Sequence, residues 1–192
     1  GDWSSDVCSS DLFATPSPLV YPLVTYSTPN IHELSTLYQH LQFSELPIYA
    51  SGAWFDAINL NADLLSTRLP AWVIQEGVVL QAVQLLPIIR TLFIKSGDRG
   101  VLVVQRVSGE EAVKAWKPEG RKKGTLVAAS SFLSDEAVVV RHYPAMELPE
   151  EELGTVTGAG DNLAGAMLAA MVRGLSPSLP SELDRIVDLA QR

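Results

Sequence analysis

A glycine-spaced turn that leads into a helix of small residues, within residues 154–171, constrains this chain more than any other stretch. It reads Gly-Thr-Val-Thr-Gly-Ala-Gly-Asp-Asn and continues as Leu-Ala-Gly-Ala-Met-Leu-Ala-Ala-Met. Glycine adopts backbone dihedrals that other residues avoid, and its missing side chain lets a ligand approach the main chain. A helix start adds unpaired N–H groups and the positive end of the helix dipole, which together favour an anion.

Asp161 is the carboxylate at this junction. Backbone donors that hold negative charge, beside a carboxylate that orients or deprotonates a hydroxyl, suit phosphoryl transfer. The same residues also fit a structural interpretation, in which Asp161 is the N-cap of the helix and Gly158 and Gly160 form a tight turn. Glycine-rich patterns are weak indicators alone, so the rest of the chain must decide between the two.

Composition limits the classes of function. The chain has 192 residues, of which 47% are hydrophobic, and this is enough for one domain with a core. A net charge of −8 disfavours nucleic acid and anionic membranes as partners. The single cysteine excludes a disulfide within the chain, and the three histidines lack metal-ligand spacing. Without a membrane-spanning apolar run or a signal-peptide pattern, we expect a cytoplasmic protein.

Residues 1–12 differ from the rest of the chain, because they are rich in Ser and Asp and follow no regular pattern. They resemble a translated sequencing adapter, so we interpret them as non-native and start the domain at Phe13. On this interpretation, residues 13–192 are a fragment whose upstream sequence is missing.

The remaining pattern predicts an α/β domain with a mainly parallel sheet. A helix is expected from about Asn30 to Gln42, and a second, interrupted at Pro87, over 72–90. Strands are expected over 19–26, 91–95, 101–105, 126–132 and 137–143, a solvated loop over 106–124, and helices after the glycine turn and over 182–191.

Asn30 and Glu33 lie three residues apart at the start of the first helix, so their side chains meet at its first turn. This spacing fits a capping box, in which each side chain accepts a hydrogen bond from the other residue's backbone N–H. The turn that contains Gly97 and Gly100 is also unremarkable when taken alone. Both segments gain meaning from their order along the chain.

In this order, three segments resemble motifs in the C-terminal half of the ribokinase-like (PfkB) sugar and nucleoside kinases. They are residues 29–33, similar to the family's Asn-x-x-Glu, residues 95–100, similar to its Thr-x-Gly-x-x-Gly turn, and residues 155–166, similar to its C-terminal signature. The third is the most specific and the second the weakest. The resemblance covers about residues 19–192. Among subfamilies it is greatest for fungal pseudouridine-kinase-like domains, which are often fused to a pseudouridine-phosphate glycosidase.

The resemblance implies a ribokinase-like three-layer α/β/α fold, here without the N-terminal half and the lid. It implies ATP-dependent phosphorylation of a sugar hydroxyl on a carbohydrate or nucleoside, with pseudouridine as the expected substrate. Asp161 would be the catalytic base. The N–H groups of Gly158, Ala159 and Gly160 would form the anion hole for the γ-phosphate.

The resemblance also implies the groups that hold the nucleotide and its metal. Ser96, Gly97 and Gly100 would line the ATP site together with Gly158 and Gly160. Asn30 and Glu33 would position hydrated Mg²⁺, which prefers oxygen ligands and keeps several waters. A monovalent cation as a further cofactor and assembly into a homo-oligomer stay open.

The chain departs from the family pattern at several positions. Thr155 stands where the signature usually has Asp or Asn, and Lys95 and Ser96 replace the usual Thr and a small or apolar residue. No glycine-rich sugar-binding segment occurs. Three alternatives therefore remain: another ribokinase-like sugar or adenosine kinase, a non-catalytic module that retains the fold, and an unrelated α/β domain whose glycine turn is only structural.

Overall fold

The computed structural model describes residues 23–42, 69–116, 125–129, 136–146 and 158–191. Its strands are β1 (Val24–Ser27), β2 (Ile89–Lys95), β3 (Val101–Ser108), β4 (Thr125–Ala129) and β5 (Glu136–Tyr143), which form one sheet in the order β1-β2-β3-β5-β4. Its helices are α1 (Ile31–Gln42), α5 (Ala71–Gln75), α6 (Val78–Leu85), α7 (Glu110–Trp116), α8 (Ala159–Val172) and α9 (Pro180–Gln191), and a short 3₁₀ turn, η2 (Gly97–Arg99), joins β2 to β3.

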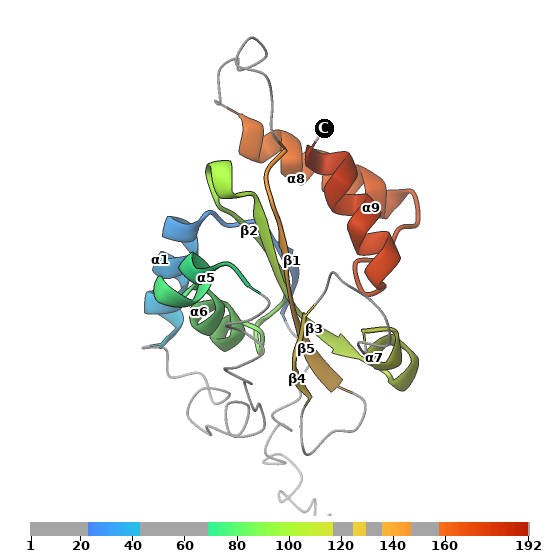
Figure 1. Cartoon of the computed structure of the whole chain (residues 1–192), viewed down its shortest axis with the longest axis horizontal. Helices are drawn as coiled ribbons and strands as arrows, with labels where there is room; N and C mark the ends of the chain where they lie inside the picture. Colours follow the sequence, from blue (N-terminus) through green and yellow to red (C-terminus); the bar gives the residue numbers. More distant parts are fainter. Residues whose placement is uncertain (1–22, 43–68, 117–124, 130–135, 147–157, 192) are drawn as a thin grey trace, which may run out of the picture.

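Helices cover both faces of the sheet, as Figure 1 shows: α1, α5 and α6 lie on one side and α7, α8 and α9 on the other. Two separate groups of buried apolar residues fill the spaces between these layers. The strand residues alternate between the two groups, because successive side chains of a strand point to opposite faces. The protein therefore has the α/β three-layer arrangement expected from its sequence.

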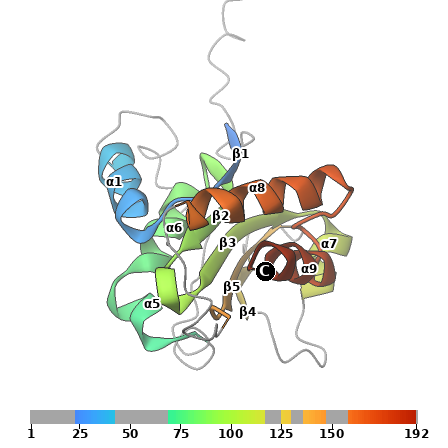
Figure 2. The same ribbon diagram turned by 90° about the horizontal axis from the view of Figure 1, so that it is seen from above.

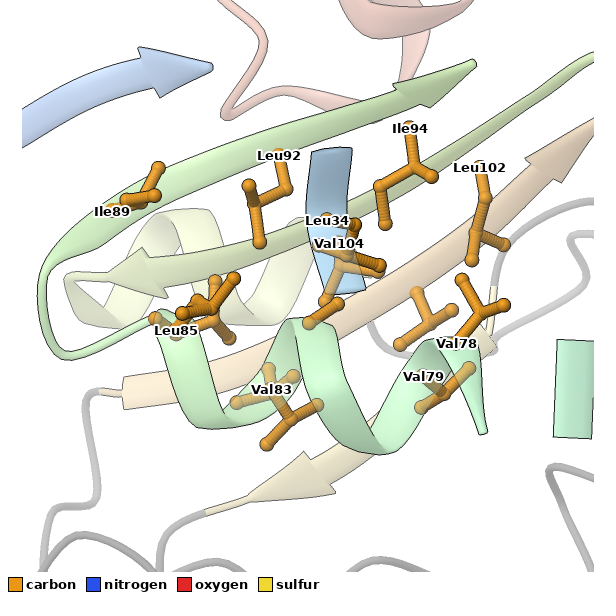
Figure 3. Packing of buried hydrophobic residues seen from close by; sticks show 14 of the residues in the cluster. Leu34, Val78, Val79, Val83, Leu85, Ile89, Leu92, Ile94, Leu102 and Val104 are labelled. Carbon is orange, nitrogen blue, oxygen red and sulfur yellow. The ribbon is translucent and has the colours of Figure 1, made fainter. Parts of the chain in front are cut away.

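Figure 3 shows the group of buried residues between the sheet and the side with α1, α5 and α6. There, Leu92, Ile94 and Leu102 from the strands face the buried side of α6. Leu34 of α1 belongs to the same cluster and is fully buried. On the opposite face, Phe93 packs with residues of α7, α8 and α9. β2 and β3 are thus buried on both sides, which accounts for their mostly apolar sequence.

The sheet is mixed rather than mainly parallel, so that part of the expectation is wrong for the described strands. β1 and β2 are parallel, whereas β2 with β3, β3 with β5, and β4 with β5 are antiparallel. The physical reason lies in the connections. A turn as short as the one between Lys95 and Val101 can only reverse the chain, because a parallel connection needs a crossover of about a dozen residues or more.

Two local predictions also change. The helix expected over 72–90 is divided at Gly77, which has a left-handed φ of 67° and caps α6. The second part, α6, ends at Leu85, before Pro87, and Ile89 already belongs to β2. The loop expected over 106–124 contains the end of β3 and the helix α7, whose Val113 and Trp116 are buried three residues apart. Across the ranges described, no helix is long and apolar enough to cross a membrane.

Candidate functional site

The end of β2 is the point at which the three sequence motifs approach one another. The backbone N–H of Lys95 donates to the Pro29 carbonyl oxygen over 2.8 Å, and Lys95 and Asn30 form a parallel bridge. The next residue, Ser96, opens the glycine turn, and its N–H donates to the Gly100 carbonyl oxygen over 2.8 Å. The first helix and the glycine turn are therefore joined through the main chain of β2.

Asn30 and Glu33 form the capping box that their spacing predicts. The N–H of Asn30 donates to Glu33 Oε2 over 2.7 Å, and the N–H of Glu33 donates to Asn30 Oδ1 over 2.8 Å. Both residues are exposed. The structural interpretation of this pair is confirmed, and the magnesium role stays a prediction.

An open hollow of about 420 Å³ lies beside Glu33 at the carboxyl end of β1, and its lining is Ser27, Thr28, Pro29, Glu33, Thr36 and Leu37. The cap occupies Glu33 Oε2 and leaves Oε1 without a bond to the described residues. A carboxylate oxygen with free lone pairs can accept hydrogen bonds from the waters of a hydrated cation. The residues therefore fit an outer-shell contact with Mg²⁺. The described ranges contain no group of three acidic, histidine or cysteine residues that could bind a metal directly.

The glycine turn has one open glycine and one packed glycine. Gly97 has a φ of 61°, is exposed, and has no atom within 4 Å of the place where a Cβ would be, so a ligand could approach its backbone. Gly100 has a φ of 91°, and a Cβ there would overlap the Tyr143 carbonyl oxygen. Packing against the end of β5 therefore explains Gly100. The Ser96 hydroxyl is buried and forms no hydrogen bond within the described part of the chain.

Arg99 holds the glycine turn against the neighbouring elements. Its guanidinium pairs with Glu76 over 2.6 Å and lies 4.2 Å from the centre of the Trp72 ring. Its carbonyl oxygen accepts a hydrogen bond from His142 Nε2 over 2.7 Å. These contacts fix the position of the turn, and their participants did not stand out in the sequence because they come from three separate elements.

The start of α8 differs from the arrangement in which Asp161 is the N-cap of the helix. Gly158, with a φ of 85°, is the N-cap, and the helix begins at Ala159. Asp161 lies in the first turn, so the interpretation of Asp161 as N-cap is wrong. Its side chain is exposed and forms no hydrogen bond or ion pair with any described residue, and only its N–H donates, to the Gly158 carbonyl oxygen over 3.0 Å. The carboxylate is therefore accessible to a ligand from the solvent. Thr155 and the rest of the turn before Gly158 lie outside the described residues.

Lys95 is the site residue that the motif comparison treated only as a departure. Its ammonium lies 3.0 Å from the position that a Cβ on Gly160 would occupy. In Figure 1 the start of α8 lies close to the end of β2, and Figure 2 shows α8 lying over the sheet from above. The structure thus brings together the cap of α1, the end of β2 and the first turn of α8. No local sequence pattern pointed to Lys95, because its contact with α8 joins segments that lie far apart in the chain.

No family model matches the sequence, and no curated protein matches it either. Solved structures that match include a ribokinase from Thermotoga maritima, with 19% identity, a TM-score of 0.40, and coverage of 86% of this chain and 33% of that one. An aminoimidazole riboside kinase from Salmonella enterica and an adenosine kinase from Schistosoma mansoni, the latter in complex with 2-fluoroadenosine, have 14% and 15% identity and TM-scores of 0.36. Each of these two matches covers 87% of this chain and 33% of the other. The chain spans about a third of the length of these structures.

Proposed function

We propose that this chain is the ATP-binding, C-terminal portion of a ribokinase-like kinase, which transfers the γ-phosphate of ATP to a hydroxyl group of a sugar or nucleoside. The start of α8 is the observation that carries the proposal. There, an exposed carboxylate that bonds to none of the described residues lies in the same turn as N–H groups of a glycine-capped helix that are likewise unpaired among those residues. An acid in the first turn of a helix also interacts favourably with the helix dipole, so the proposal depends on the combination of this carboxylate with the N–H groups beside it.

Each group has a defined part in the reaction. Asp161 accepts the proton of the attacking hydroxyl. The hydroxyl oxygen of the acceptor forms a bond to the γ-phosphorus while the bond from that phosphorus to the β–γ bridging oxygen breaks, which releases ADP. The N–H groups of Gly158, Ala159 and Gly160 stabilise the charge on the transferring phosphoryl group. Asn30 and Glu33 would hold the hydrated Mg²⁺, which when bound neutralises phosphate charge. The open backbone of Gly97 and the neighbouring Ser96 supply the nucleotide site.

Pseudouridine is the finer substrate proposal, and the sequence resemblance alone supports it. Ribose and adenosine are the competing acceptors within the same kinase class. A non-catalytic module is the competing class of function, and Thr155, at a position where the family signature usually has Asp or Asn, favours it. Turnover by the parent protein separates these alternatives.

The test uses the full-length parent protein, recovered by resequencing the locus, and measures ADP release with pseudouridine, ribose and adenosine. We expect turnover with one of them. Asp161→Asn should lower kcat about 10²- to 10⁴-fold, with the KM for ATP changed by less than about threefold, because the base acts mainly in the transition state. Glu111→Gln is the matched control, since Glu111 is also an exposed acid in the first turn of a helix, and its kcat should stay unchanged.

Two outcomes would contradict the proposal. A folded parent protein that phosphorylates none of the acceptors would exclude the kinase function and support the non-catalytic module. Activity that Asp161→Asn leaves unchanged would remove Asp161 from the role of base while leaving the reaction itself in place.

A further inference from the structure

We propose that the outer edge of β1 is an interaction surface, and that it pairs with a further β-strand from the part of the parent protein that precedes Phe13. The existence of that part rests on the proposed function, in which this chain is the C-terminal portion of a longer kinase. The pairing itself is tested separately from phosphoryl transfer. The occupant is an uncharged strand with apolar side chains on the face that meets Val24 and Tyr26.

The main chain of β1 is open on one side. Among the described strands, β1 lies at the end of the sheet and pairs with β2 alone. The N–H of Val24 donates to the Ile88 carbonyl oxygen over 2.9 Å, so the polar main-chain groups of Val24 point to β2. Successive residues of a strand direct these groups to opposite sides. The N–H and carbonyl groups of Thr25 therefore point to the open edge, where another strand can pair with them.

Apolar side chains gather at this edge. Leu23, Val24 and Tyr26 are 81%, 40% and 38% exposed. The Tyr26 ring lies 6.4 Å from the ring of Phe93, which is fully buried. Val24 and Tyr26 share one face of β1, and strands in parallel pairs are normally covered on both faces. The buried core therefore reaches β1 and ends there on side chains that a further element would cover.

The sequence of β1 lacks the features that protect a natural sheet edge. Exposed edge strands usually carry a charged side chain or a proline, which prevents pairing with another strand. β1 reads Val-Thr-Tyr-Ser, and residues 13–31 contain no charged residue, although 19% of the whole chain is charged. Such a strand is suited to the inside of a sheet. The partner that fits this edge is therefore another uncharged strand.

The connectivity of the chain favours an upstream strand over a second copy. The chain enters β1 at Leu23, so upstream sequence is tethered to this edge at an effective concentration on the order of millimolar. A second copy has to compete from solution at a much lower concentration. Residues 13–22 are themselves poor candidates, because proline occurs at positions 16, 18 and 22 and cannot donate a ladder hydrogen bond. The occupant therefore comes from the sequence before Phe13.

Amide hydrogen exchange of Thr25, followed by NMR, tests the pairing in the full-length parent protein and in this chain. In the parent, we expect the Thr25 N–H to exchange at least about 10²-fold more slowly than in this chain, because it donates to the added strand. The N–H of Val24 is the internal control and should change less, since it bonds to Ile88 in both proteins. Equal exchange of the Thr25 N–H in the two proteins would overturn the inference.

Thr25→Pro removes the N–H at the open edge. Proline is tolerated on a free edge, so the unfolding equilibrium constant of this chain should change by less than about fivefold. In the parent it should rise about 10- to 100-fold, because the added strand loses a hydrogen bond and meets the proline ring. Urea unfolding measures both. A parent variant that does not fold, beside a variant of this chain that does, gives the same answer.

Thr25→Val is the matched control, because valine keeps the N–H and suits a strand. It should change the unfolding equilibrium constant by less than about fivefold in either protein. If Thr25→Pro has the same effect in the parent as in this chain, no strand is paired with β1 in the parent, and the inference is wrong.

Sedimentation of this chain identifies the competing occupant. A dimer that Thr25→Pro dissociates, together with rapid exchange of the Thr25 N–H in the parent, would overturn the inference and assign the edge to a second copy. A parent whose genuine sequence supplies no strand before Phe13 would overturn it as well.

The interface and the kinase function fail separately. A protected Thr25 N–H in a parent that transfers no phosphate would support the interface and overturn the kinase function. Rapid exchange of the Thr25 N–H in a parent that is an active kinase would overturn the interface and leave the kinase function in place.

Discussion

Asn30 and Glu33 hold each other's backbone amides at the first turn of α1, each side chain accepting one hydrogen bond from the other residue. The cap uses Oε2 of the carboxylate and leaves Oε1 directed to no described residue. A capping role and an outer-shell magnesium role are therefore compatible in one side chain. The two roles respond differently to substitution, because capping needs an acceptor oxygen and the cation needs the charge.

Glu33→Gln keeps the acceptor and removes the charge. Glutamine also closes a capping box, so the free energy of unfolding should change by less than about 0.5 kcal/mol. In the parent protein, the Mg²⁺ concentration that gives half-maximal turnover should rise several-fold, because the hydrated cation loses a charged partner. Urea unfolding and a magnesium titration of the rate measure the two effects.

Glu33→Ala is the companion variant, since it removes both functions. It should cost about 0.5–1 kcal/mol of stability and also raise the Mg²⁺ concentration that gives half-maximal turnover. If Glu33→Gln leaves the magnesium dependence unchanged, Glu33 is only a cap, and the metal assignment is wrong.

The two glycines of the η2 turn should differ sharply when each is replaced by alanine. Gly100→Ala would place a methyl group on the Tyr143 carbonyl oxygen at a φ of 91°, and we expect a loss of at least about 4 kcal/mol or no folded protein. Gly97→Ala adds its methyl group to open space at a φ of 61°, so only the backbone strain of about 1–2 kcal/mol applies. Equal losses, measured by urea unfolding, would contradict this assignment of roles.

Local sequence rules predicted a large part of this fold. The apolar spacing and the Asn30 cap predicted α1 with its observed limits, and the short glycine turn predicted the hairpin of β2 and β3. Gly158 and the small residues after it predicted the start of α8. Each of these features depends on residues within a few positions of one another, and a single sequence is therefore enough to predict them.

Contacts between distant segments were not predictable in this way. The mixed sheet depends on which strands pair. The mostly polar sequence of α7 gave little indication that Val113 and Trp116 are buried, because their burial depends on packing against the sheet and the helices on that side. The contact of Lys95 with Gly160 joins the end of β2 to a helix that follows the whole hairpin and β5. Periodicity and capping carry no information on such pairs, since they are decided by packing.

The ion pair of Arg106 with Glu136 should contribute far more than the pair of Lys114 with Glu110. The first pair joins β3 to β5, with side chains 5% and 13% exposed, and the second lies on α7, with side chains 60% and 72% exposed. Glu136→Gln should therefore cost about 3 kcal/mol, because it removes the charge of a carboxylate that pairs with a guanidinium in a buried environment. Glu110→Gln should change stability by less than about 0.5 kcal/mol. Similar losses in the two variants, measured by urea unfolding, would contradict the ranking by burial.

Tyr143 should make the protein less stable at alkaline pH. Burial raises the pKa of its phenol well above the ordinary value of 10.0, and Asp184, which accepts its hydrogen bond over 2.9 Å, raises the pKa further, while Arg141 opposes both. Above about pH 10, the unfolded chain loses this proton and the folded protein keeps it. The stabilising effect is therefore complete below pH 10 and declines above it, by up to about 1.4 kcal/mol per pH unit.

Tyr143→Phe isolates this effect. The variant should lose about 1 kcal/mol of stability at neutral pH, because phenylalanine cannot donate the hydrogen bond to Asp184. The loss stays this small because the Asp184 carboxylate is half exposed and regains water in the variant. Between pH 10 and 11 its stability should fall less steeply than that of the wild-type chain, since no phenol at position 143 can lose a proton on unfolding. Urea unfolding at pH 8, 9, 10 and 11 measures both slopes. An equally steep decline in the variant would show that other groups cause the alkaline loss and that the Tyr143 phenol releases its proton equally in both states.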